Sequence, residues 1–461
     1  TLVSGVAAGT IVYAVGQTAI AGTVGSSIFS SLTVSGAAHI GSMVLDSPLP
    51  IASGGTAAIT AAAARSALTV LTTKGDINVF STIDDRLPVG SDGQGIRAQA
   101  SQSAGVVWTD FYDRPNLLIN PNWQIDQIND GTLYTVTGGG AVVQGPDGWS
   151  GYAVNAPGVF KLRTLADPDN AALKCLEITC TTSDAAIGAT DRYEIYTIIE
   201  GYDAAALMAG TASAQPITIQ FKFKTNVTGV YGVAIQNSAT NRSYYGIITV
   251  ADTAEHEYSI SLTMDTTGTW LYTNGIGLML RLTLAAGSDY QGTAGAWAAD
   301  AKQTTSAQCN FMSANTNVAY LKRIQLIPGS VVQAYKPADI QKELAKCQRY
   351  YNALDYGATN SSWLLGFCQT AVTFQALYQY PVRMRATPTL LVAGVAADYY
   401  VVSTAGTTVC SALPVNNGGA LSTDKQTFIN FTVAAGLTVS HGGVGSSATA
   451  TGRLSLNARL S

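Results

Sequence analysis

The stretch ITIQFKFK, residues 217–224, alternates apolar and polar side chains at every position. Because successive side chains of a β-strand point to opposite faces of a sheet, its Ile and Phe residues share one face and its Thr, Gln and Lys residues share the other. GLMLRLTL, residues 277–284, repeats the pattern with leucine at every second position. EHEYSISLTM (255–264) and VAYLKRIQLI (318–327) add two further segments of this kind. Together they predict half-buried antiparallel strands.

These segments belong to a long strand-rich region, residues 112–334, in which short strands alternate with polar turns. A region of this size with this pattern predicts an antiparallel two-sheet sandwich or jelly roll. Residues 355–461 again show period two, for example in VTFQALYQY (372–380) and LSLNARL (454–460), and predict a smaller C-terminal β-sandwich as a tip domain. The expected fold class is therefore mainly β.

Between the two predicted sandwiches, residues 335–354 (YKPADIQKELAKCQRYYNAL) change to a helical period and predict a connecting helix. Pro337 stands at the expected helix start and Asp339 in the first turn, while Lys346 and Arg349 come late, as the helix dipole prefers. The apolar residues form one narrow stripe, which suits a helix–helix seam or docking onto a sandwich. The expected seam residues are Ile340, Leu344, Cys347 and Tyr351.

The N-terminal part divides into a β-rich shaft segment (1–47), a Gly-Gly turn with a short Ala-rich helix (48–70) and a β-hairpin shaft segment (71–111). Residues 1–47 are cut by glycine too often to build a core of their own, so we expect them to intertwine with copies of the same chain. Thr56 or Thr60 can cap the helix. The helix is too short to be stable alone, and its small side chains let helices approach closely. We expect the helix copies to meet around a shared axis through Ala61, Ala62, Ala63, Ala64 and Leu68.

Composition excludes several classes of partner. Charged residues make up 12% of the 461 residues and the net charge is −4, so the basic face that nucleic-acid binding requires is not expected. No apolar run approaches the roughly 18 residues of a membrane span, so membrane insertion is not expected either. Six cysteines without a CxxC motif indicate free, mostly buried thiols and folding in a reducing compartment. Residues 1–30 lack the basic region of a signal peptide, and a start at Thr1 without Met indicates a piece of a longer protein.

The sequence shows no grouping of residues typical of catalysis or metal binding. His39, His256 and His441 are far apart and lack partners at metal-ligand spacing, so we predict no metal site and no cofactor. GxSxG, P-loop, HExxH and GxGxxG motifs are missing. Turn formation is the favoured role for the acidic residues of ADPDN (166–170), against calcium binding or catalysis. The carboxylate pairs considered for glycan hydrolysis are Asp84 with Asp85, Asp167 with Asp169, and Glu194 with Glu200.

Aromatic residues are the better indication of a binding site. The chain has 22 Tyr and 6 Trp residues, and flat rings with a polar edge can pack on the apolar face of a sugar while hydroxyl and amide groups supply hydrogen bonds. For any single ring, core packing is the commoner role. The expected carbohydrate-binding residues are Trp363, Tyr399 and Tyr400 in the tip domain and Trp270, Tyr272 and Trp297 in the sandwich.

Several segments, taken in order, resemble the tail fibres or receptor-binding proteins of tailed bacteriophages. PIASGGTAAITAAAARSAL (50–68) resembles the Gly-Gly-Thr turn and Ala-rich helix of that family, and LPVGSDGQGIRAQASQSAGVVWTD (87–110) is similar to the hairpin that often follows. NLLINPNWQI (116–125) with GPDGWSGY (145–152) looks like the start of the family's jelly roll, a start shared loosely with carbohydrate-binding modules. Residues 268–297 and 320–351 resemble its last strands and exit helix, and YPVRMRATPTL (380–390) and LSLNARL (454–460) resemble the terminal sandwich.

The resemblance implies an elongated homotrimer that joins other tail or baseplate proteins of a virion through its N-terminal end. It also implies non-catalytic adhesion to a bacterial surface polysaccharide, outside the cell, by a protein made in the host cytoplasm. No set of catalytic residues is carried over. Related jelly-roll starts often have Gly and an acidic residue where Pro121 and Trp123 stand here, so a structural calcium ion is not supported.

Two alternative functions stay open. A tailspike that depolymerises glycans would need clustered acids in a groove, and usually a long β-helix with repeated turns, and the sequence has neither pattern. A secreted carbohydrate-binding adhesin would need a signal peptide. The missing signal peptide counts against this alternative, although a truncated start weakens that argument.

Overall fold

The structure, a computed structural model, divides into two compact units, Thr1–Asp113 and Arg114–Ser461. Most of the secondary structure consists of β-strands, so the predicted mainly β class is confirmed. The predicted shaft segment 1–47 lies outside the described residues. The residues that the structure describes are 60–90, 94–110, 115–129, 131–168, 170–354, 362–416, 422–449 and 451–460.

Helix α1 (Ala61–Leu68) forms where its propensity predicts it. Thr60 is the N-cap: its hydroxyl accepts a hydrogen bond from Ala63 N at 3.1 Å, which satisfies one of the free amides of the first turn. Ala61 and Ala63 are exposed, Ala64 is half-buried and Leu68 is 69% exposed. The meeting of helix copies around an axis stays a prediction.

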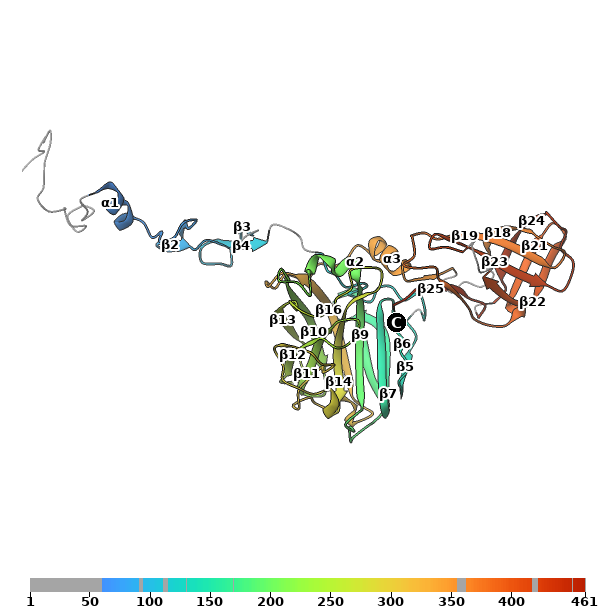
Figure 1. The fold of residues 1–461 in the computed structure, drawn as a ribbon, viewed down its shortest axis with the longest axis horizontal. Helices are drawn as coiled ribbons and strands as arrows, with labels where there is room; N and C mark the ends of the chain where they lie inside the picture. Colours follow the sequence, from blue (N-terminus) through green and yellow to red (C-terminus); the bar gives the residue numbers. More distant parts are fainter. Residues whose placement is uncertain are drawn as a thin grey trace, which may run out of the picture. The chain divides into compact units, whose positions relative to one another are not determined.

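Two antiparallel hairpins complete the first unit (Figure 1). Trp108 fastens them together, since its indole N–H donates to the Pro88 carbonyl at 2.6 Å. A Cβ atom on Gly90 would lie 2.6 Å from the Trp108 ring, so the LPVG turn needs glycine there. The strands are β1 (Ile77–Phe80) with β2 (Asp84–Leu87), and β3 (Gln94–Ala98) with β4 (Val106–Asp110).

The second unit begins with a two-sheet antiparallel sandwich (Figure 1). The strands form one continuous 12-stranded sheet that turns at β7 into two layers. One layer has the order β13-β10-β16-β8-β7-β5 and the other has the order β6-β7-β9-β14-β11-β12-β15. Strand β7 belongs to both, because Trp149–Val154 pairs with β9 and Val159–Asp167 pairs with β8. Asn155, at a φ of 55°, and Gly158 lie at the change of partner. A Cβ atom on Gly158 would lie 2.6 Å from the Tyr193 hydroxyl, so this crossing requires glycine.

The elements of the sandwich follow the alternation of the sequence. In β10 the Ile and Phe residues of ITIQFKFK are buried in the core, and the Leu residues of GLMLRLTL in β14 face them from the other sheet. The elements are β5 (Tyr134–Gly139), β6 (Val143–Gln144), β7 (Trp149–Asp167), β8 (Asn170–Thr182), β9 (Arg192–Glu200), α2 (Gly201–Ala204), η2 (Ala205–Leu207), β10 (Pro216–Thr225), β11 (Gly229–Gln236), β12 (Ser243–Val250), β13 (His256–Thr263), β14 (Ile276–Ala286), η3 (Ser288–Tyr290), β15 (Trp297–Ala298), η4 (Phe311–Ser313) and β16 (Val318–Pro328).

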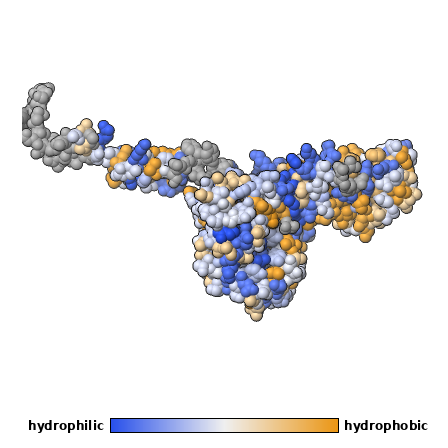
Figure 2. Space-filling view, viewed as in Figure 1, coloured by the Kyte–Doolittle hydropathy of each residue, from blue (hydrophilic) through white to orange (hydrophobic). Residues whose placement is uncertain are grey.

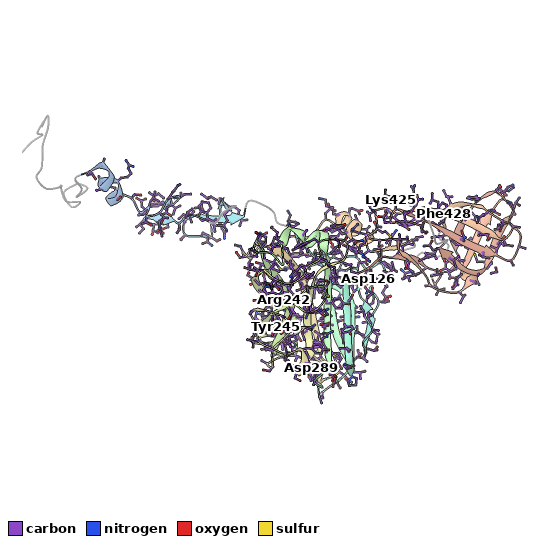
Figure 3. The ribbon with its side chains drawn as sticks, in the orientation of Figure 1. Asp126, Arg242, Tyr245, Asp289, Lys425 and Phe428 are labelled. Atoms are coloured by element: carbon purple, nitrogen blue, oxygen red, sulfur yellow. The ribbon has the colours of Figure 1, made fainter. Side chains whose placement is uncertain are left out.

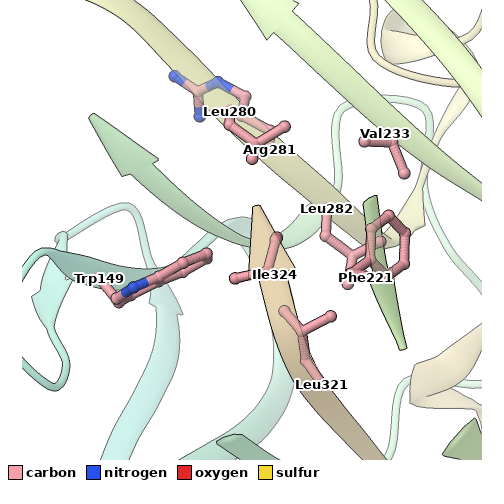
Figure 4. A pocket seen from close by; sticks show the side chains of 8 residues that line it. All are labelled: Trp149, Phe221, Val233, Leu280, Arg281, Leu282, Leu321 and Ile324. Atoms are coloured by element: carbon pink, nitrogen blue, oxygen red, sulfur yellow. The ribbon is translucent and has the colours of Figure 1, made fainter. Parts of the chain in front are cut away.

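The space between the sheets is filled by side chains. Figure 4 shows the void that remains there, which has a volume of about 10 Å³ and so offers no room for a sugar. In the same view the guanidinium of Arg281 points away from the apolar side chains. The void is lined by Trp149, Phe221, Val233, Leu280, Arg281, Leu282, Leu321 and Ile324.

The segments NLLINPNWQI and GPDGWSGY pack against each other at one end of the sandwich. The rings of Trp123 and Trp149 lie 5.1 Å apart between centroids, and Trp123 is fully buried. The Asn120 amide donates to the Ile125 and Asp147 carbonyls at 2.7 and 3.0 Å. These two segments therefore have a structural role: together they form one packed corner of the sandwich, which we call the sandwich corner.

The connecting helix is shorter than predicted. Helix α3 runs over Ile340–Gln348, because the side chain of Asp339 caps it and accepts from Gln341 N at 2.9 Å. Residues 335–339 are therefore not helical, and Tyr351 belongs to a strand.

The predicted seam residues are brought together only in part. Cys347 is buried against Ile119 and Ile125 of the sandwich corner, with Leu344 packed beside it. Ile340 is 42% exposed and lies outside this contact. Tyr351 is buried as part of β17 and not of the helix. The helix therefore docks onto the sandwich through its C-terminal half, where Leu344 and Cys347 lie.

The C-terminal region is a closed barrel with a small sheet beside it, where the sequence predicts a sandwich. The barrel order is β18-β19-β23-β22-β21-β24, and β24 closes it by pairing with both β18 and β21. A Cβ atom on Gly445 of β24 would lie 2.7 Å from the Phe431 ring, so glycine lets large rings fill the interior. Period-two alternation is the same in a barrel and a sandwich, so the sequence does not distinguish these two arrangements. The elements are α3 (Ile340–Gln348), β17 (Tyr351–Ala353), β18 (Ser362–Cys368), β19 (Thr373–Gln379), β20 (Thr389–Val392), η5 (Ala396–Asp398), β21 (Tyr399–Ser403), β22 (Gly406–Asn416), β23 (Gln426–Val433), β24 (Gly442–Ser447) and β25 (Leu454–Asn457).

The outer wall of the barrel is apolar at many positions. Figure 2 shows hydrophobic residues gathered over this part of the chain. Leu365 is 75% exposed, and the other exposed apolar side chains of its strands include Phe367, Leu377, Val402, Val409 and Val415.

Candidate functional site

The outer face of one sheet gathers aromatic and charged side chains from β7, β9 and β14, which lie side by side in Figure 1. In β9 (RYEIYTIIE) the inward residues join the core, while Arg192, Glu194 and Tyr196 point outward. The strand register places Tyr152 of β7 opposite Glu194, and Arg281 of β14 opposite Tyr196. We call this surface the Tyr–Arg face and define it as Tyr152, Arg192, Glu194, Tyr196, Arg281 and Tyr290.

One carboxylate at the base of the face serves two guanidinium groups. Glu194 is fully buried and accepts a short hydrogen bond from Arg281, which is buried as well. Arg192 Nε lies 3.5 Å from Glu194 Oε1. Buried charges are tolerated when they are paired, and here the three groups leave a surplus of one positive charge.

The arginines also hold the tyrosine rings in place. The guanidinium carbon of Arg192 lies 4.4 Å from the Tyr290 ring centroid and 5.1 Å from that of Tyr152. The guanidinium carbon of Arg281 lies 4.9 Å from the centroid of Tyr196. Such cation–π contacts fix ring orientation. Tyr152 and Tyr290 are only half-buried, so part of each ring is accessible.

Several polar atoms of the face have unused hydrogen-bonding capacity. Among the described residues, no hydrogen-bond partner is found for Glu194 Oε2, Arg192 Nε or Arg281 Nε. Burial raises the pKa of Tyr196, so its phenol stays protonated. The face therefore places one buried acceptor and two buried N–H groups beside half-buried rings. This is the combination that binds a ligand with hydroxyl groups and an apolar face.

The chain after β14 forms a wall next to the face. Gln303 N and Thr304 N both donate to the Tyr290 carbonyl, at 2.9 and 3.2 Å, and fix Tyr290 in η3. Figure 3 labels the residue before it, Asp289, near the lower end of the sandwich. A Cβ atom on Gly232 of β11 would lie 2.4 Å from the Gln303 carbonyl, so this wall needs glycine beneath it.

The sandwich residues predicted from the sequence lie elsewhere. Trp270 is buried, and its N–H donates to the Thr267 carbonyl at 3.1 Å, so its ring packs in the core. Trp297 is half-buried, lies 5.5 Å from Trp270 between centroids, and donates to the Thr263 carbonyl at 2.8 Å. Tyr272 is partly exposed, but its hydroxyl donates to a backbone carbonyl.

In the tip domain, Tyr399 is also a core residue. It is fully buried, and its hydroxyl donates to the Arg453 carbonyl at 3.0 Å, so neither ring face can meet a ligand. Tyr400, the next residue of β21, is half-buried. Trp363 belongs to β18, and its side chain lies outside the described residues.

The carboxylate pairs considered for hydrolysis are used in other ways. Glu200 accepts from Arg349 at 2.6 and 2.8 Å and holds the region after α3. Asp167 is buried and lies 3.0 Å from Lys322 Nζ. Asp169 lies outside the described residues, and Asp84 and Asp85 are exposed on β2.

The residues of the Tyr–Arg face carried a signal in the sequence. RYEIY alternates as a strand does, but its outward positions hold aromatic and charged residues together. This combination indicates an outward face with a role beyond solubility. The partners from β7 and β14 come from 40 and 89 residues away from Arg192 (152 and 281 against 192). Only the strand pairing brings them together.

The described part of the chain has neither a metal-ligand cluster nor a membrane-spanning helix. There, no group of three or more His, Cys, Asp or Glu side chains is placed to hold a metal ion. No described helix combines the length and apolar character needed to cross a membrane. All six cysteines are free, and only Cys309 is not buried.

No protein-family model matches the chain, and a search of curated proteins gives no match. Solved structures similar to part of it include an arabinose-bound α-L-arabinofuranosidase (13% identity, TM-score 0.26), the enzymatically active domain of bacteriophage CBA120 tailspike protein 4 (10%, 0.23) and a family 4 carbohydrate-binding module (10%, 0.22). Each alignment covers 46% of this chain, but 26%, 21% and 98% of the respective partner. The chain thus spans about a quarter or less of the two enzymes.

Proposed function

We propose that the chain binds a glycan through the Tyr–Arg face. The observation that carries the proposal is the half-buried pair Tyr152 and Tyr290, which flank Arg192 above a buried Glu194 whose Oε2 has no described partner. A sugar ring can stack its C–H face on the tyrosines. Its hydroxyl groups can then donate to Glu194 and accept from the arginines.

The finer proposal is a tail fibre that adheres to a polysaccharide on the bacterial surface, outside the cell, without cleaving it. The ordered fibre-like segments of the sequence support this role. Glycoside hydrolysis generally uses two carboxyl groups flanking the scissile bond, whereas the Tyr–Arg face holds one, paired with two arginines. That arrangement supports binding without cleavage.

The proposed assembly is a homotrimer joined to other virion tail proteins through its N-terminal end. The exposed apolar surfaces of α1 and of the barrel wall support self-association, since large exposed apolar patches commonly mark protein contacts. Light scattering on the purified chain tests it: a mass of three chains is expected, and a monomer overturns the trimer.

Binding is tested with the purified full chain on an array of bacterial surface polysaccharides. For the glycan retained, Tyr152→Ala and Tyr290→Ala should each weaken binding roughly tenfold, about 1.4 kcal/mol. Tyr202→Ala is the matched control, because Tyr202 is an exposed tyrosine on α2, away from the face. Equal binding by all three variants contradicts the proposal. Release of new reducing ends from the glycan would favour a depolymerase.

A further inference from the structure

The other outer face of the sandwich carries a cavity much larger than the void between the sheets. Its volume is about 370 Å³, within the range of small-molecule sites. It lies between the outer surface of β10, β13 and β16 and the chain that leaves β16, residues 329–337, which we call the strap. Its lining residues are Leu173, Gln220, Phe221, Lys222, Glu257, Arg323, Ala334, Tyr335 and Pro337.

The strap is fixed to the sheet, so the cavity is built before any ligand arrives. The Thr218 hydroxyl of β10 donates to the Gly329 carbonyl at 2.7 Å. The Gln325 amide of β16 donates to the Gln333 carbonyl at 2.9 Å. These bonds anchor the strap before Tyr335. A pre-formed cavity loses less conformational entropy when a ligand binds.

A β-bulge directs Arg323 to the cavity. The register of β10 with β16 shifts between Gln220 and Lys222, and Arg323 takes a φ of 51° there. Such a backbone conformation is uncommon for a residue with a side chain and is found preferentially at functional sites. Bulges re-aim side chains in the same way.

Two buried polar atoms in the lining lack a hydrogen-bond partner among the described residues: Arg323 Nε and the Tyr335 hydroxyl. Another nitrogen of Arg323 lies 3.4 Å from Asp167, which holds the guanidinium in place. Burial raises the pKa of Tyr335 to about 12, which keeps the hydroxyl protonated at neutral pH. Buried polar groups are normally hydrogen-bonded to protein or ordered water, so these two groups have capacity for a further partner.

The charges around the cavity are balanced within the protein. Lys222 Nζ lies 3.0 Å from Glu255, and Lys322 Nζ lies 2.6 Å from the same carboxylate. Gln220 donates a short hydrogen bond to Glu257. With the cations already paired, the cavity favours hydroxyl groups over a free anion.

We propose that this strap cavity is a second binding site, for an uncharged polyhydroxylated ligand of mono- or disaccharide size. Hydroxyl oxygens of the ligand accept from Arg323 Nε and the Tyr335 hydroxyl, and Glu257 accepts from another ligand hydroxyl. Leu173 and Pro337 contact the apolar side of the ligand. The cavity and the Tyr–Arg face belong to different sheets, so the chain would hold two ligands independently.

The test uses the full chain carrying Tyr152→Ala and Tyr290→Ala, so that the Tyr–Arg face does not contribute. Titration calorimetry with glucose, galactose, mannose, N-acetylglucosamine and their common disaccharides should find at least one ligand with one site per chain. In that background, Tyr335→Phe should weaken binding at least fivefold without lowering the melting temperature, since it removes a hydroxyl that has no described partner. Ala334→Trp, at an exposed lining position, should abolish binding by filling the cavity.

Tyr320→Phe is the matched control, because the Tyr320 hydroxyl contacts Glu177 on the same sheet face outside the lining. Unchanged affinity in both Tyr335→Phe and Ala334→Trp overturns the proposal, as does a panel in which no saccharide binds. A lowered melting temperature for Tyr335→Phe would show that the hydroxyl has a structural role, and this too counts against the site. If the Tyr152 and Tyr290 variants lose polysaccharide binding but still bind a saccharide in the strap cavity, the two sites are shown to bind independently.

Discussion

The sandwich and the barrel differ in the kind of side chain that their outer surfaces carry. The sandwich buries charged residues on its outer faces, with Glu194 and Arg281 on one sheet and Lys322 and Asp167 on the other. The barrel exposes apolar residues on its outer wall, Leu365 among them. Buried, paired charges suit polar ligands, whereas exposed apolar residues suit contacts with protein. Under the proposed function, ligand binding therefore belongs to the sandwich and association to the barrel.

The largest expected effect on the sandwich comes from neutralising Glu194. Glu194→Gln leaves Arg281 buried without its counter-charge, and removing one partner of a buried pair typically costs about 3 kcal/mol or more. We expect the free energy of unfolding of the second unit to fall by about that amount in urea titrations. Glu257→Gln is the control, because Glu257 is exposed on β13. Equal stability of the two variants would mean that the sandwich does not depend on its buried pair.

The barrel should instead depend on fitting apolar groups into a small interior. Gly445→Ala places a methyl group 2.7 Å from the Phe431 ring, and overpacking of this kind costs about 2 kcal/mol. Gly442→Ala, three residues earlier in the same strand, meets its nearest atom at 3.9 Å and should be neutral. Thermal unfolding of both variants, followed by circular dichroism, measures the difference. A neutral Gly445→Ala would contradict the packing of Phe431 against β24.

The sequence predicted strands well and ring positions poorly. ITIQFKFK and GLMLRLTL specify which side chains face the core, because burial of alternate residues depends on local order alone. Tyr399 and Trp270 were expected at a surface and lie in the core, because a strand pattern does not say which of its two faces is covered. The Tyr–Arg face depends on the pairing of β7, β9 and β14, a long-range property that no local pattern contains. Closure of the barrel likewise depends on β24 meeting β18 and β21.

The smallest expected difference between the sandwich and the barrel is in how their stability changes at acid pH. In the sandwich, burial alone would raise the pKa of Glu200, but hydrogen bonds from Arg349 and Tyr350 outweigh it and lower that pKa below its usual value of 4.5. A carboxyl group with a lowered pKa contributes stability above its unfolded pKa, and this contribution is lost as the pH falls through the folded pKa. The stability from Glu200 should therefore be complete at neutral pH and decline below about pH 4.5.

Glu200→Gln removes this charge, and we expect a loss of about 1 kcal/mol at pH 7 with little difference from the unmodified chain at pH 3. Asp398→Asn in the barrel is the comparison variant. The pKa of Asp398 is lowered by hydrogen bonds from Val395 and Thr449, but the residue is only half-buried, so solvent weakens its contribution. Urea unfolding at pH 7 and pH 3 measures both variants. An equal loss of stability for Glu200→Gln at the two pH values would show that Glu200 acts through its shape and not through its charge. The sandwich and the barrel would then not differ in how their stability depends on acid pH.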